Sequence, residues 1–339
     1  MRVQVRRDTK RSGRGPNLNR DRWYTPYLFI APMMLIFAVF ILLPIAESLL
    51  SSFFTWGLLN PWRLFDPETW NFAGLGNYEA AFASEDVREA ALNTATWLLL
   101  LPALVVVVSL VLSLLLWSLR RGSAVLRIVF VAPMTISLAS AGVIWGLLYN
   151  TDPSVGVLNG VLSKLGILGD EWIIGPMTLR PGMWLAGLGT IDLGFASFPL
   201  TNLALIAVAV WAFTGFGVIT LTAGLTSISP EIIEAAQVDG ASKWQTVRHI
   251  MLPLLKGPIA MVYVICIVYA LRTFDLVFTM TGGGPGRETS VLALVIYQKG
   301  YQFLNSPQGG QAAALAVIMA AVMLLCSFPY LRGTSGKDN

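Results

Sequence analysis

EAAQVDGASKWQTVRHIMLP, residues Glu234–Pro253, separates two long apolar runs of this chain. Just before it, Ser229-Pro230-Glu231 predicts the start of a helix, because an N-cap hydroxyl, proline at N1 and a first-turn acid all favour a helix N-terminus. Gly240 predicts the end of this helix, since glycine readily adopts the left-handed conformation of the C′ position. A short helix over 230–239 is therefore expected.

A second helix is predicted after Gly240. Four of its apolar side chains recur at i, i+3, i+6 and i+7 and form one stripe: Trp244, Val247, Ile250 and Met251. Pro253 ends this helix before the next apolar run. The two helices would form a compact knob, in which small Ala235 and Ala236 permit close approach of a partner and Glu234 can pair with a basic residue. The simpler alternative is an amphipathic loop lying on the membrane surface.

The composition excludes an ordinary soluble protein. Apolar residues make up 55% of the 339 residues, charged residues only 12%, and the mean hydropathy is +0.67, whereas soluble domains carry about 25% charged residues. Cys266 and Cys326 both lie in apolar runs, where a buried thiol is ordinary. One histidine, His249, cannot build a zinc site or a catalytic triad, and no metal site is expected. We expect an all-α polytopic membrane protein without a separate soluble domain.

A transmembrane helix needs about 20 apolar residues. Six runs meet this requirement: 27–50, 92–119, 126–149, 200–225, 258–280 and 312–331. The domain prediction is a basic tail over 1–25, a transmembrane domain over 26–331 that includes a loop over 226–257, and a short tail over 332–339. The apolar run after the basic head exceeds the length of a signal-peptide core, so we interpret it as an uncleaved span.

Lysine and arginine in the short loops set the orientation. They concentrate on the side that holds the basic head, the 226–257 loop and the C-terminal tail, while acidic residues collect on the other side. Both termini and the 226–257 loop are therefore predicted to be cytoplasmic. The stretch Met183–Phe198 is too short and too glycine-rich for a seventh span. A span there would also move Lys243 and Arg248 to the external side of the membrane. Residues Thr151–Pro199 are predicted to form an external loop with interfacial helices.

Two sequence patterns argue against a nucleotide site within the chain. Gly282–Gly286, GGGPG, lacks the Lys-Ser/Thr that completes a phosphate-binding loop, and it lies on the predicted external side. No Walker A pattern occurs elsewhere in the sequence. The chain is expected to bind no cofactor and no nucleic acid, and to catalyse no reaction itself.

The segment resembles the EAA loop of ABC importer permeases, the piece that docks on the ATPase subunit. The motif fixes seven residues: Glu234, Ala235, Ala236, Gly240, Ile250, Leu252 and Pro253. Chance would produce them at this spacing with a probability on the order of 10⁻⁶ to 10⁻⁵. The resemblance extends over about residues 24–331 to the sugar-permease branch that serves maltose, glycerol-phosphate and alpha-glucosides. It implies a type I importer permease fold with six transmembrane helices. The implied ATPase-coupling residues are Glu234, Ala235, Ala236, Asp239, Gly240, Ile250, Leu252 and Pro253.

The same resemblance implies partners and a location. Expected partners are a second, similar permease subunit, two ATPase subunits that use ATP and Mg²⁺, an extracytoplasmic sugar-binding protein, and membrane lipid. The location is the bacterial inner or plasma membrane. Positions transferred from the maltose-type permease give a candidate substrate cavity: Phe213, Phe216, Cys266, Tyr269, Thr273 and Ser137. Ala209 and Ala270 stand where that permease has amides, so its sugar recognition is not expected to be identical.

The sequence thus predicts a permease subunit that moves a sugar, such as a di- or oligosaccharide or an alpha-glucoside, by ATP-driven alternating access. Glycerol-phosphate or another small polyol is the alternative cargo. A stand-alone ion-coupled secondary transporter is less favoured, because the chain shows no clear two-half repeat of interrupted helices and few buried ionisable residues. Arg272 and Asp275, at i and i+3 in the fifth run, are either a structural ion pair or part of the translocation path.

Overall fold

The computed structural model describes residues 24–119, 122–150, 154–165, 190–192, 197–199, 201–284, 286–302 and 308–335. Most of the predicted N-terminal tail, most of the predicted external loop over 151–199, Pro285, and residues 336–339 of the predicted C-terminal tail lie outside these ranges. The chain divides into two compact units, Met1–Glu47 and Ser48–Asn339, and each is described by itself.

The first unit contains most of the first predicted span. α1 (Thr25–Phe37) continues through the π-helical segment η2 (Ala38–Leu42) into α2 (Leu43–Ser51), whose last residues belong to the second unit. Nearly all of its large apolar side chains are exposed, as Phe29 (82%) illustrates. Such a surface suits a helix that is surrounded by lipid.

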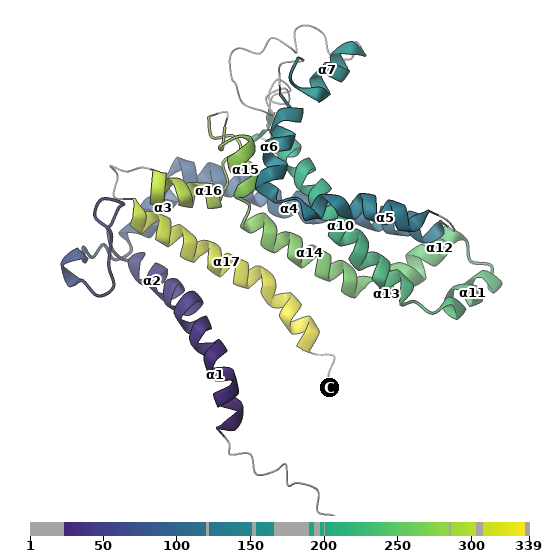
Figure 1. Cartoon of the computed structure of the whole chain (residues 1–339), viewed down its shortest axis with the longest axis horizontal. Helices are drawn as coiled ribbons and strands as arrows, with labels where there is room; N and C mark the ends of the chain where they lie inside the picture. Colours follow the sequence, from purple (N-terminus) through teal and green to yellow (C-terminus); the bar gives the residue numbers. More distant parts are fainter. Residues whose placement is uncertain are drawn as a thin grey trace, which may run out of the picture. The chain divides into compact units, whose positions relative to one another are not determined.

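Three long helices form the centre of the second unit (Figure 1): α4 (Glu85–Ser118), α10 (Thr201–Thr226) and α14 (Lys256–Leu271). Small residues let α4 and α10 approach closely. Ser109 Oγ donates to Thr214 O at 3.2 Å and Ser113 Oγ donates to Val218 O at 3.3 Å, and a side chain at Gly217 would collide with Ser109. Trp97, Leu101 and Leu205 are fully buried among these helices.

The third predicted span, 126–149, is not one straight helix. It consists of α5 (Ser123–Val131), the 3₁₀ turn η4 (Ala132–Thr135) and α6 (Leu138–Leu148), and the two helical parts meet at 101°. Pro133 cannot donate a backbone hydrogen bond inside a helix. Ser137 then begins α6, because its Oγ accepts from the Ser140 N–H at 3.2 Å. The third predicted span is therefore bent at this turn.

The fifth predicted span, 258–280, is also interrupted. α14 ends at Leu271, residues 272–274 are not helical, and α15 (Asp275–Met280) follows. Neither proline nor glycine marks this break. α15 instead packs on α6, where Thr279 fits against Gly142, and this tertiary contact explains why the helix does not continue. Within the described residues, no ion pair joins Arg272 to Asp275, so the structural bridge considered for them is absent.

The remaining elements complete the second unit. On the predicted external side lie η3 (Pro67–Thr69), α3 (Gly76–Ala83), α7 (Val157–Lys164), α16 (Leu292–Tyr297) and the π segment η6 (Gln298–Gln302). β1 (Thr190–Asp192) and β2 (Ser197–Pro199) form an antiparallel hairpin with Ile191 opposite Phe198, so the described part of 183–198 is extended. α17 (Gly309–Ser335) covers the sixth predicted span and contacts α14 and α16.

Taken together, the described residues contain four helices long and apolar enough to cross a membrane. Two bent helix pairs, Ala124–Thr135 with Leu138–Leu148 and Lys243–Leu254 with Lys256–Leu271, bring the number to six if each pair counts as one span. The fold is therefore the all-α polytopic membrane fold that the sequence predicts, with two bent spans and one small hairpin as the differences.

A buried amide pair holds the segment after α15 against the central helices. Asn93 Nδ2 donates to Glu288 O and to Ser290 O, both at 2.9 Å, and its Oδ1 accepts from Asn202 Nδ2 at 2.9 Å. Asn93 and Asn202 are 6% and 2% exposed. Because buried carbonyl groups need partners, these bonds fix the 286–290 segment to the ends of α4 and α10.

Asn93→Leu is expected to destabilise the protein by about 2–3 kcal/mol, since it leaves the Ser290 carbonyl and one Asn202 donor buried without partners. The measurement is the midpoint of thermal denaturation of the purified protein in detergent. Asn60→Leu changes an exposed asparagine in the same way and is expected to have little effect. Equal midpoints for both variants would contradict this account of the amide pair.

Candidate functional site

The helix predicted over 230–239 is α11 (Pro230–Val238). Ser229 has an extended N-cap conformation, Pro230 occupies N1 and Glu231 lies in the first turn. The Ser229 hydroxyl makes no capping hydrogen bond, so proline and the first-turn acid are the features that favour this end of the helix.

Gly240 ends α11 in the manner that its sequence position predicts. Its φ is +80°, in the left-handed region that other residues adopt at a cost. The Gly240 N–H donates to Gln237 O at 3.1 Å and the Ala241 N–H donates to Ala236 O at 2.9 Å. These two bonds form a Schellman motif, which fixes the direction in which the chain leaves α11.

The second helix begins immediately with a capping box. Ser242 Oγ accepts from the Gln245 N–H at 3.3 Å, and Gln245 Oε1 accepts from the Ser242 N–H at 2.7 Å. α12 (Lys243–Thr246) continues through the π segment η5 (Val247–Met251) into α13 (Leu252–Leu254), and this helix meets α14 at 66°.

The apolar stripe predicted for the second helix is only partly correct. Trp244 is 66% exposed, whereas Met251 is 2% exposed, and Val247 and Ile250 are half-buried. The π turn changes the angular register that a regular 3.6-residue helix would give. Trp244 is therefore left on the surface of the knob.

One apolar cluster joins both helices of the knob to the membrane helices. Ile233 of α11 and Met251 of η5 pack with Leu225 at the end of α10 and Leu255 before α14, and Leu110 and Leu114 of α4 pack against the same cluster. Met251, Leu225 and Leu255 are almost fully buried. A displacement of α11 must therefore move the ends of α10 and α14, or else open a well-packed contact.

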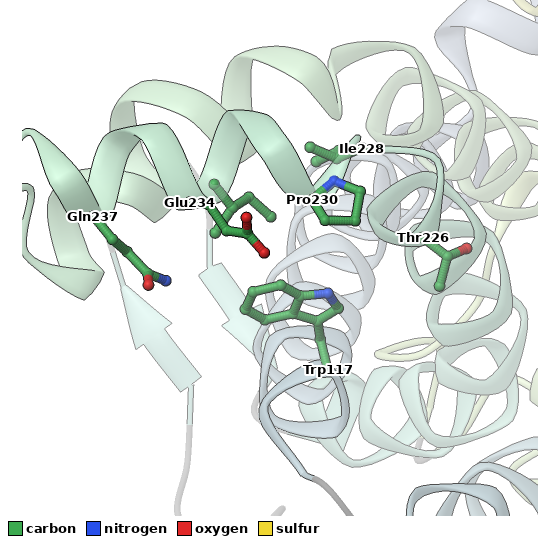
Figure 2. Close-up of a pocket in the computed structure, with 7 residues that line it drawn as sticks. Trp117, Thr226, Ile228, Pro230, Glu234 and Gln237 are labelled. Carbon is green, nitrogen blue, oxygen red and sulfur yellow. The ribbon is translucent and has the colours of Figure 1, made fainter.

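A cavity of about 350 Å³ lies between the first knob helix and the ends of α4 and α10. Its lining residues are Trp117, Thr226, Ile228, Pro230, Ile233, Glu234 and Gln237. Figure 2 shows the Glu234 carboxylate extending from α11 towards the Trp117 indole. Neither of the two ion pairs in the described part of the chain involves Glu234. The cavity thus presents a carboxylate that has no ion-pair partner among the described residues and lies beside a large aromatic ring.

The coupling residues predicted from the sequence divide into an outward and an inward set. Glu234, Ala235, Asp239, Gly240 and Pro253 are exposed. Ala236 is 9% exposed, and Ile250 and Leu252 are half-buried. The exposed set lies on the surface of the knob, while the inward set packs against the rest of the chain.

The sequence-based prediction missed four residues that line the cavity: Trp117, Thr226, Ile228 and Gln237. Trp117 is distant in sequence, and its position at the end of α4 was the available signal. An aromatic residue at the end of a span is usually an interfacial anchor, which explains why it did not stand out.

The candidate substrate residues are brought together only in part. The Phe213 and Tyr269 ring centroids lie 4.3 Å apart, with the rings inclined at 48°, and Phe216 packs against the same core. The Tyr269 hydroxyl oxygen is buried and has no hydrogen-bond partner among the described residues. α10 and α14 therefore place an aromatic pair beside a buried hydroxyl group.

The other three predicted cavity residues lie in different surroundings. Cys266 and Thr273 are each 0% exposed, and Thr273 Oγ1 donates to Tyr269 O at 3.1 Å, so neither side chain is accessible to a ligand. Ser137 caps α6, and its Oγ donates to Ser140 Oγ at 2.8 Å. The bend in the third span accounts for the position of Ser137, because it places this residue at a helix start.

Comparison with known proteins provides independent evidence. The family described as "Binding-protein-dependent transport system inner membrane component" matches residues 80–332. The sulfoquinovosyl glycerol transport system permease protein of Agrobacterium fabrum is 31% identical over 92% of this chain and 90% of its own length. The alpha-glucoside transport system permease protein of Rhizobium meliloti is 29% identical, over 91% and 82%. The osmoprotective compounds uptake permease protein of Synechocystis is 28% identical, over 88% and 95%.

A solved structure shows the same fold. A chain of a bacterial ABC transporter involved in the import of the acidic polysaccharide alginate matches with a TM-score of 0.68 and 22% identity. The match covers 93% of this chain and 96% of that one. Family, relatives and fold agree with the resemblance carried by the knob. The chain belongs to the inner membrane components of binding-protein-dependent transport systems, the permease subunits of ABC importers.

Proposed function

We propose that this chain is one of two permease subunits in an importer of sugars or polyols, and that an ATPase subunit docks on the knob formed by α11 and α12. The observation that carries the proposal is the cavity beside Glu234, where an exposed carboxylate with no ion-pair partner among the described residues lies on a helix anchored to the spans. A helix that only lies on the membrane surface would need no such anchoring, whereas a docking element that transmits movement must be packed against the membrane helices.

Closure of the ATPases on ATP would displace α11, and the cluster of Ile233, Met251, Leu225 and Leu255 would pass that displacement to α10 and α14. Both helices contribute to the Phe213–Tyr269 pair. Energetically, the closed ATPases must bind the outward-facing permease more tightly than the inward-facing one. ATP and Mg²⁺ are bound by the ATPase subunits in this proposal, and this chain binds neither.

The orientation follows from the positive-inside rule. The knob carries Lys243 and Arg248 and is placed in the cytoplasm, with both chain termini on the same side. The extracytoplasmic binding protein then delivers cargo to the opposite face. Support for such a partner comes from the solved alginate transporter, which has been crystallised in complex with an alginate-pentasaccharide-bound periplasmic protein.

The proposed cargo is a sugar or a sugar-containing polyol, with an alpha-glucoside or other di- or oligosaccharide as the finer expectation. Two of the relatives named above are permease proteins of alpha-glucoside and sulfoquinovosyl glycerol transport systems, and a third relative, from Thermococcus litoralis, is a trehalose/maltose transport system permease protein that is 29% identical. An aromatic pair beside a buried hydroxyl suits the apolar face and hydroxyl groups of a sugar ring. Another relative, 28% identical, is an sn-glycerol-3-phosphate transport system permease protein. A small phosphorylated polyol is therefore the second candidate cargo.

The test is purification of the assembled transporter followed by an ATPase assay in proteoliposomes, with its binding protein and a panel of sugars, polyols and glycerol-3-phosphate. We expect an ATPase to co-purify and hydrolysis to rise with one sugar or polyol. Uptake into vesicles that contain no ATPase, driven by an ion gradient, would overturn the proposal.

Phe213→Ala is expected to reduce the rate of cargo uptake about tenfold, which corresponds to about 1.4 kcal/mol, because it removes one ring of the aromatic pair. Initial rates of uptake at subsaturating cargo are the measurement. Phe82→Ala removes a 70% exposed ring from α3 and serves as the control for insertion. Equal rates for the two variants would exclude Phe213 from the cargo path.

A further inference from the structure

A second cavity lies between α5 and the last two turns of α10. Its volume is about 270 Å³, and its lining residues are Arg127, Val218, Ile219, Thr222, Ala223 and Thr226. One side is closed by direct helix contact: a Cβ added to Gly215 would lie 2.6 Å from Phe130 O and 2.9 Å from Val131 Cα. The helices thus touch at Gly215, and a space remains between them further towards the end of α10.

Two polar groups in this lining have unmet hydrogen-bonding capacity. Arg127 Nε and Thr222 Oγ1 are both buried atoms without a hydrogen-bond partner among the described residues. Thr222 is only 5% exposed. A buried donor left without a partner is unfavourable, so a native structure usually supplies a water, an ion or a ligand at such a place.

The charge of Arg127 is also uncompensated within the described part of the chain. The two ion pairs found there join Arg88 to Glu85 and Arg287 to Asp86, and neither is at this end of α10. An arginine guanidinium carries a positive charge and a planar set of N–H donors that match the oxygens of a carboxylate or a phosphate. Its position between two membrane helices therefore calls for an anion.

The size and position of the cavity restrict what that anion can be. Pockets for drug-sized ligands are roughly 300–1,000 Å³, so this cavity suits a single small group better than an oligosaccharide. It lies at the C-terminal end of α10, next to the knob, on the side that the proposed orientation makes cytoplasmic. Basic pockets between membrane helices on that side bind anionic headgroups.

We propose that the cavity binds the phosphate of an anionic phospholipid from the cytoplasmic leaflet, with Arg127 donating charged hydrogen bonds and the Thr222 hydroxyl donating another. Thr226 lines both this cavity and the one beside Glu234. A bound headgroup would thus brace the junction of α5 and α10 directly behind the ATPase-docking surface. Only the side of the membrane rests on the proposed function.

The test is native mass spectrometry of the delipidated transporter, titrated with phosphatidylglycerol and separately with phosphatidylcholine. We expect one phosphatidylglycerol to bind more tightly than any phosphatidylcholine. Arg127→Gln should weaken this binding about tenfold, and Thr222→Val, which preserves shape, should weaken it severalfold. Lys256→Gln removes an exposed charge at the start of α14, outside the cavity, and should leave the affinity unchanged.

Three results would overturn the proposal. Equal phosphatidylglycerol affinity in Arg127→Gln, Thr222→Val and the unchanged protein would exclude the cavity as the lipid site. Displacement of the lipid by millimolar inorganic phosphate would assign the cavity to a free anion. Absence of any preference for phosphatidylglycerol in the unchanged protein would exclude an anionic lipid headgroup as the occupant of the cavity. Because this test measures lipid binding, its result does not depend on whether the protein transports the proposed cargo.

Discussion

Glu234→Lys is expected to lower ATP-driven uptake by at least about thirtyfold, with membrane insertion unchanged. The Glu234 carboxylate lines the knob cavity and has no ion-pair partner in the described part of the chain, so its partner is expected on the ATPase. Truncating one member of a desolvated interfacial charge pair costs at least about 2 kcal/mol, and charge reversal adds repulsion. Uptake of radiolabelled cargo by whole cells measures the effect, with immunoblotting of membranes to verify insertion.

The matched control is Glu231→Lys. Glu231 is exposed on the same helix and carries the same charge, but it does not line the cavity. Its replacement removes a favourable first-turn acid, a loss of only about 0.3–1 kcal/mol. If both variants transported equally well, the carboxylate at 234 would have no special role, and docking through the knob would be contradicted.

Gly240→Pro is expected to abolish uptake as well, through geometry instead of charge. Proline fixes φ near −65° and has no N–H, whereas Gly240 has φ +80° and donates to Gln237 O. The Schellman motif would be lost, and α12 would leave α11 in a different direction. The ATPase activity of the purified complex should become independent of cargo, because hydrolysis would no longer be coupled to the spans.

Gly240→Asn distinguishes the effect of the backbone conformation at position 240 from the steric effect of adding a side chain there. No heavy atom lies within 4 Å of a Cβ added at this position, and asparagine adopts the left-handed conformation at small cost. This variant should retain most of the uptake. Loss of uptake in Gly240→Asn equal to that in Gly240→Pro would show that the side chain, and not the backbone conformation, is decisive.

The bounds of the membrane helices can be predicted from the lengths of the apolar runs. The positions of the bends in these helices cannot be predicted in this way. α10 (Thr201–Thr226) agrees with the predicted 200–225 to within one residue, because a run bounded by polar residues leaves little freedom. The break after Leu271 could not be anticipated, since it depends on Thr279 packing against Gly142 of α6. Pro133 could have suggested the bend in the third span, but proline is tolerated within α4 at Pro102.

The site shows the same division between local and distant causes. Proline at N1 and glycine at C′ act within one helical turn, so the bounds of α11 were predictable. The exposure of Trp244 was not, because the π segment after it alters the register. The cavity beside Glu234 depends on Trp117, more than a hundred residues earlier in the chain. Contacts at such separation require the packed structure.

The most direct test of the central claim is site-specific cross-linking at the exposed face of α11. Ala235→Cys, placed in a Cys326→Ala background because Cys326 is exposed and Cys266 is buried, provides the reactive position, and Phe82→Cys on α3 is the control on the opposite side. We expect position 235, and not position 82, to cross-link to an ATP-hydrolysing subunit of the native complex. Full uptake by a transporter in which position 235 cross-links to no ATPase would contradict the account.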